Sequence, residues 1–88
     1  MQIEQTGEHE YLVRLTEAEN QVQFLIRAAP PVLAQLGFQP HQEAQVVTAT
    51  AAFLIRRQLA ADLPDVVDLD DVAAFYDDYL DELAKGLP

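Results

Sequence analysis

The sequence predicts a small α+β domain, in which an N-terminal antiparallel β-meander of two or three strands packs against a short helix and two longer C-terminal helices. Three observations lead to this prediction. Apolar and polar residues alternate in the first third of the chain, as they do in half-buried strands. The pair Pro30-Pro31 then ends this pattern. Beyond it, apolar residues recur at helical spacing.

The length and composition predict a single domain over residues 1–88. Half of the residues are hydrophobic, but 13 of these are alanine, which buries little area. The remaining apolar side chains can form a core of modest stability. We therefore expect association with a second copy or with another protein to help the fold.

The first two strands are expected at residues 2–5 and 10–15, joined by a turn at residues 6–8 in which Gly7 can take a positive φ. Their β-branched and aromatic content agrees with this assignment. The alternating apolar positions of the second strand are Tyr11, Val13 and Leu15.

Residues 16–28 allow two interpretations. Thr16 and Glu19 fit a capping box, which would begin a helix. The following apolar residues alternate with polar ones instead, as in a strand; they are Val22, Phe24 and Ile26. We favour a loop at residues 16–20 and a strand at residues 21–28.

The short helix is expected to begin at the proline pair, because proline suits the first helical turn, and to end at Gly37. Phe38 should fold back as an apolar anchor. A second helix is expected at residues 41–61, ended by Asp62-Leu63-Pro64.

Residues 64–67 are expected to form a loop that leads to Asp68, a good N-cap for a third helix at residues 69–84. One face of this helix is apolar and is expected to lie in the core, with Tyr76 and Tyr79 at its margins. The residues of this face are Leu69, Val72, Phe75, Tyr76, Tyr79, Leu80 and Leu83.

The expected helix that begins at proline and ends in Leu36-Gly37 is followed by a long helix, which contains the run Ala51-Ala52-Phe53-Leu54-Ile55-Arg56-Arg57. In these two features the chain resembles short uncharacterised bacterial proteins in which a small β-hairpin precedes two or three helices. The resemblance does not extend to Asp70–Leu83. It implies the strand at residues 21–28, and it implies no function.

The second helix carries apolar residues on two sides, which is unusual for a surface helix. It is either sandwiched between the sheet and the third helix, or it lies at an interface between two copies of the chain. Arg56 and Arg57 border the second apolar stripe and would suit such an interface. The predicted partner-binding residues are therefore Val46, Ala49, Phe53, Arg56, Arg57 and Ala60.

The outer side of the third helix predicts an acidic surface made of Asp77, Asp78, Asp81 and Glu82. It is a solvated face, a contact surface for a basic protein, or a site for a divalent cation. The spacing of the aspartates from Asp65 to Asp71 does not match a calcium-binding loop, and no Glu-x-x-His motif occurs. We therefore expect no metal site and no cofactor.

Catalytic chemistry has little support in the sequence. The chain has no cysteine and no serine, so disulfides, thiolate zinc sites and serine nucleophiles are excluded. Its two histidines, His9 and His41, are expected to be exposed at a turn and at a helix start. The glycines are isolated, so no phosphate-binding loop is expected. We expect a protein that is not an enzyme.

The formal net charge of -10 disfavours nucleic acids and anionic membranes as partners. The start of the chain lacks the pattern of a signal peptide, so a cytoplasmic protein is expected. The main functional hypothesis is a non-catalytic interaction protein that forms a homodimer through the second helix. The alternatives are an acidic decoy or antitoxin-like inhibitor of a basic partner, and a small-molecule pocket lined by Tyr11, Phe24 and Tyr76.

Overall fold

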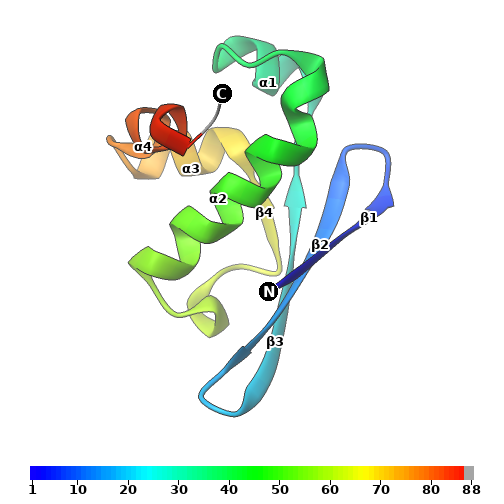
Figure 1. The fold of residues 1–88 in the computed structure, drawn as a ribbon, viewed down its shortest axis with the longest axis vertical. Helices are drawn as coiled ribbons and strands as arrows, with labels where there is room; N and C mark the ends of the chain where they lie inside the picture. The colour runs from blue at the N-terminus through cyan, green and yellow to red at the C-terminus, as the bar shows by residue number, and fades with distance from the viewer. Residues whose placement is uncertain (87–88) are drawn as a thin grey trace.

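The computed structural model describes residues 1–86, which form a four-stranded mixed sheet with its helices on one face (Figure 1). The α+β class is confirmed, with four strands in place of the two or three expected. The strands are β1 (Gln2–Gly7), β2 (Glu10–Glu17), β3 (Asn20–Arg27) and β4 (Val66–Asp68). The helices are α1 (Pro30–Gln35), η1 (Pro40–Gln42), α2 (Glu43–Arg57), η2 (Ala60–Asp62), α3 (Leu69–Phe75) and α4 (Tyr79–Gly86).

The first three strands form the predicted antiparallel meander, and the strand interpretation of residues 21–28 is confirmed by β3. The register places Val13 opposite Phe24 and Tyr11 opposite Ile26. These four side chains are buried and face the helices. The alternation that predicted the strands therefore reflects one covered sheet face.

The loop expected at residues 16–20 is a tight two-residue turn, because β2 continues to Glu17. Ala18 and Glu19 form this turn, with φ angles of 51° and 70°. A two-residue hairpin turn with both central residues at positive φ matches the twist of the flanking strands. Within the described residues Gly37 is the one glycine with positive φ. The turn after β1 therefore uses His9, at 58°, and not Gly7.

The short helix agrees with its prediction. α1 begins at Pro30 and is followed by Gly37, whose φ of 92° requires a residue without Cβ strain. Phe38 folds back, and its amide donates a hydrogen bond of 2.9 Å to the carbonyl of Leu33. The half-buried Phe38 ring packs on the core, as expected.

β4 lies where a loop was expected, at Val66–Asp68. It joins the edge of the sheet parallel to β3, with Val67 next to Ile26. Val67 is buried, so this short strand completes the covered face. It also fixes the start of α3, for which Asp68 occupies the N-cap position without a side-chain capping hydrogen bond.

The third helix was expected to be continuous over residues 69–84, and this prediction is wrong. The chain leaves the helix after Phe75 and resumes it at Tyr79, forming α3 and α4. The break turns Phe75 outwards, where 79% of it is exposed, and places Tyr79 fully in the core. Both positions differ from the predicted amphipathic face.

The end of α2 is held by the sheet. The second helix is shorter than the predicted 41–61, because the chain leaves α2 after Arg57 and forms η2. The Glu17 carboxylate, at the end of β2, accepts hydrogen bonds from the backbone amides of Ala60 (2.7 Å) and Ala61 (3.3 Å). These amides begin η2 and have no partner within it, so Glu17 satisfies them.

No described helix has both the length and the apolar character needed to cross a membrane.

Candidate functional site

The predicted second stripe of α2 lies mostly inside the fold. Val46 and Phe53 are fully buried, and Ala60 is 2% exposed. Phe53 packs edge-on against Tyr76 and Tyr79, with ring centroids 5.2 and 5.4 Å away. The sandwich interpretation of α2 therefore holds for these positions. Val46, Phe53 and Ala60 offer no surface to a partner in this structure, which corrects their assignment as partner-binding residues.

The Arg57 side chain also makes its contacts within the molecule. Its guanidinium forms an ion pair with Asp78 and lies 4.5 Å from the centre of the Phe53 ring. This contact lowers the pKa of the Asp78 carboxyl and raises that of Arg57, mainly through their shared hydrogen bond. Beside it, the Gln58 amide donates a 2.9 Å hydrogen bond to the hydroxyl of Tyr76.

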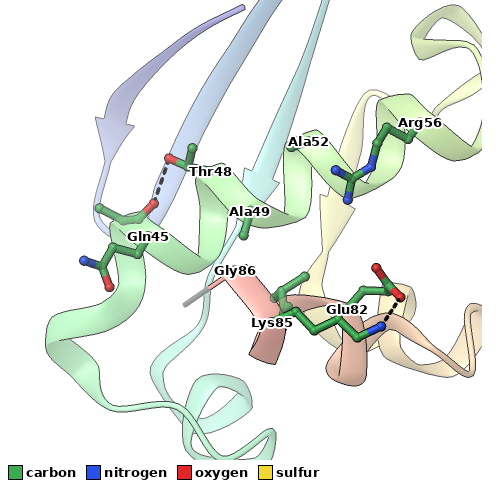
Figure 2. Close-up of a pocket in the computed structure, with 10 residues that line it drawn as sticks. Gln45, Thr48, Ala49, Ala52, Arg56, Glu82, Lys85 and Gly86 are labelled. Carbon is green, nitrogen blue, oxygen red and sulfur yellow. Dashed lines mark hydrogen bonds and ion pairs between the residues drawn. The ribbon is translucent and has the colours of Figure 1, made fainter. Parts of the chain in front are cut away.

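The remaining two predicted partner-binding residues, Ala49 and Arg56, do lie at the surface. They line a groove of about 680 Å³ between α2 and α4, which we call the α2–α4 groove. In Figure 2, Ala49 and Arg56 extend from α2 towards α4, where Glu82 and Lys85 lie. The residues lining the groove are Ala44, Gln45, Thr48, Ala49, Ala52, Arg56, Glu82, Leu83, Lys85 and Gly86.

The α2 side of this groove is made of small side chains. Ala49 and Ala52 are partly exposed, and Ala44 and Thr48 are exposed. The Thr48 hydroxyl donates a 3.0 Å hydrogen bond to the carbonyl of Ala44, so it is turned back towards its own helix (Figure 2). A second helix can therefore approach α2 closely here. No ion pair involving Arg56 occurs within residues 1–86.

The four carboxylates of the predicted acidic surface lie in different environments. Asp78 pairs with Arg57, and Glu82 accepts a 3.1 Å contact from the Lys85 ammonium. Asp77 lies at the break between α3 and α4, and Asp81 is exposed on α4. Two of the four carboxylates are thus already balanced by bases of the same chain.

A cluster that the sequence did not predict joins the sheet to the start of α2. The two oxygens of the Glu43 carboxylate bind different groups: the Tyr11 hydroxyl donates at 2.5 Å, and the His9 Nδ1 lies 2.6 Å away. Burial, together with this carboxylate, raises the pKa of Tyr11 to about 12. Glu43 also lies in the first turn of α2, where a negative charge is favourable.

This cluster fastens two elements together. The Glu43 side chain is 13% exposed, and Glu43, His9 and Tyr11 do not line the α2–α4 groove. His9 is half-exposed, and His41 is exposed as expected. Glu43 is 34 residues from His9 and 32 residues from Tyr11 in the sequence, so no local sequence motif could have revealed the cluster.

The small-molecule pocket expected between Tyr11, Phe24 and Tyr76 is not formed by these residues together. Tyr11 and Phe24 are buried side chains of the core. Tyr76 instead lines a separate hollow of about 310 Å³ beside α3.

No family model, curated protein or solved structure matches this chain.

Proposed function

We propose that this chain is a non-catalytic interaction protein that associates with a second copy of itself through the outward face of α2. The observation that carries the proposal is the α2–α4 groove, in which small side chains line α2 beside Arg56. Small residues at a helix surface permit close approach, and arginine is enriched at protein interfaces. Two-fold dimers are the commonest assemblies of identical chains.

Charge supports a second copy as the occupant. Arg56 at the groove has no ion-pair partner among residues 1–86, and neither has Asp81 on α4. A two-fold arrangement that brings Arg56 of one copy to Asp81 of the other makes this ion pair twice. The rest of the surface opposes association, because two molecules of charge -10 repel each other. The apolar contact therefore has to supply the affinity.

The alternative of an acidic decoy is less well supported. A surface that imitates nucleic acid needs unbalanced negative charge, but Asp78 and Glu82 are paired with Arg57 and Lys85. We therefore do not adopt this function.

Sedimentation velocity over a range of concentrations tests the proposal. We expect the wild-type chain to sediment as a dimer, and Thr48→Glu to raise the dissociation constant at least tenfold, because it adds charge and bulk to the proposed contact. Thr16→Glu makes the same change at an exposed position on the opposite, uncovered face of the sheet, and it should leave the dimer intact.

Two further results sharpen this test. Added salt should strengthen the dimer, because it screens the repulsion between two acidic molecules. A wild-type chain that remains monomeric at all concentrations contradicts the proposal. So does a dimer that Thr16→Glu and Thr48→Glu weaken equally.

A further inference from the structure

A second surface lies beside α3, away from the α2–α4 groove. It is a hollow of about 310 Å³ formed by the end of α2, the η2–β4 connection, β4 and α3, and we call it the α3 hollow. Its apolar lining includes Leu63, Val66, Val72, Phe75 and Tyr76, and its carboxylates are Asp62 and Asp71.

Phe75 is the most exposed large apolar side chain of the described residues, at 79%. It stands at the end of α3, where the chain leaves the helix, and its ring contacts that of Tyr76 edge-on at 5.0 Å between centroids. Exposed aromatic side chains beside a concave apolar surface mark places where proteins bind other molecules. Burying this ring provides a driving force for association that the folded monomer does not use.

The charged residues that line the α3 hollow are both acidic. Residues 62–71 include five aspartates and no lysine or arginine. Two of these, Asp62 and Asp71, line the hollow from separate elements, η2 and α3. Among the described residues that line it, none is basic. Arg57, which lies over the Tyr76 ring, is already paired with Asp78.

We propose that the α3 hollow is a docking site for a segment of a partner protein that carries a large apolar side chain flanked by lysine or arginine. The apolar side chain enters the hollow against Phe75, and the flanking bases meet Asp62 and Asp71. This occupant follows from charge complementarity, since an acidic rim disfavours acidic segments, including the acidic surface of a second copy. The proposal does not depend on dimerisation through α2.

Random peptides displayed on phage, selected against the full wild-type chain, are the probe for this site. We expect the enriched peptides to share a large apolar residue with lysine or arginine on its flanks. The best of them, measured by fluorescence anisotropy, should bind at least fivefold more weakly to Phe75→Ser and to Asp71→Lys, as expected for contacts that contribute about 1 kcal/mol or more. Binding should also weaken with salt.

Matched substitutions separate this site from the general properties of an acidic protein. Leu59→Ser removes another exposed apolar side chain, and Glu8→Lys reverses another exposed acid, but neither residue lines the hollow. Both variants should bind the peptide like the wild type. Circular dichroism checks that all four variants are folded; since Phe75 and Asp71 are exposed, we expect them to be.

The proposal is overturned if no peptide is enriched, if the enriched peptides lack the apolar-basic composition, or if Phe75→Ser binds as tightly as the wild type. Equal loss of binding in Asp71→Lys and Glu8→Lys also overturns it, because the attraction is then to the net charge alone. If the wild-type chain is monomeric but still selects such peptides, the proposal for the α3 hollow is supported and only dimerisation through α2 is contradicted.

Discussion

Arg57 and Asp78 form an ion pair that joins the end of α2 to the break between α3 and α4 within one molecule. The Arg57 guanidinium also lies over Phe53 and near Tyr76. Arg57, which was expected to face a partner, thus pairs with Asp78 of the predicted acidic surface. The ion pair links α2 to the connection between α3 and α4.

Arg57→Ala should therefore lower the thermal stability, whereas Arg56→Ala, one residue away and without an ion pair in the described structure, should leave it nearly unchanged. The Asp78 pKa is lowered in the folded state, so the contribution of this pair is present above the unfolded value of 3.8 and is lost as the pH falls below it. Thermal melts at neutral pH and in acid, for both variants, check this. Equal effects of the two substitutions would contradict it.

The buried hydroxyl pair of Thr50 and Tyr79 predicts an asymmetric response to mutation. Their oxygens are 2.7 Å apart, and the Thr50 hydroxyl also donates to the carbonyl of Val46 at 2.7 Å. Thr50→Val leaves the Tyr79 hydroxyl buried without a partner and should cost about 1–3 kcal/mol. Tyr79→Phe leaves Thr50 satisfied by Val46 and should cost less.

Urea denaturation of Thr50→Val, Tyr79→Phe and the double variant measures these costs. The double variant should be more stable than Thr50→Val alone, because the unsatisfied hydroxyl is removed with its partner. Additive losses would show that the two hydroxyls do not interact.

The turn between β2 and β3 predicts a stabilising substitution. Glu19 has a φ of 70°, a conformation that glycine adopts without strain. Glu19→Gly should therefore raise the free energy of unfolding by about 1 kcal/mol, a typical strain for such a residue. Glu4→Gly in the regular part of β1 is the control and should lower stability, because glycine weakens a strand. Chemical denaturation of both variants shows whether each substitution raises or lowers the free energy of unfolding.

Two tyrosines predict a loss of stability at alkaline pH. Burial raises the pKa of Tyr79 to about 12, against a smaller lowering by Thr50, and burial with Glu43 raises that of Tyr11 to about 12. Both values exceed the unfolded value of 10, so the protonated form is favoured by folding. The stabilisation is complete below pH 10 and is lost as the pH rises to 12. Ultraviolet absorbance of tyrosinate should show two late-titrating groups, one of which disappears in Tyr11→Phe.

The cluster around Glu43 predicts a destabilised junction between β2 and α2 when the carboxylate is removed. Glu43→Ala leaves the buried Tyr11 hydroxyl without its acceptor and should cost about 1–3 kcal/mol. Glu43→Gln keeps an acceptor of the same size and should cost less. Calorimetry of the two variants measures these losses. If Glu43→Ala does not lower the stability, the carboxylate does not hold β2 and α2 together.

Local patterns predicted the meander and the short helix well. The alternation around Phe24 identified β3 because a sheet covered on one face enforces a period of two. Gly37 marked the end of the α1 region because few other residues accept its φ. These features depend on neighbours in sequence, so the sequence is enough to recognise them.

The features that depend on distant contacts were missed. β4 has three residues, too few to show an alternation, and it exists because β3 offers an edge to Val66–Asp68. Apolar spacing continues through the break after Phe75, so periodicity alone indicated one helix. The same limit applies to the site. The sequence showed two apolar sides on α2, but only the fold decides that Phe53 is covered and Arg56 is not.

The parallel pairing of β4 with β3 has a consequence for synthesis of the chain. The meander is built from neighbouring strands and is made first, but its covering helix α2 and its fourth strand are made later. Until they emerge from the ribosome, the apolar row of Val13, Phe24 and Ile26 faces water. A nascent chain of this topology therefore passes through a stage in which the apolar face of the sheet is exposed to water. At that stage the exposed face can associate with other proteins before the helices cover it.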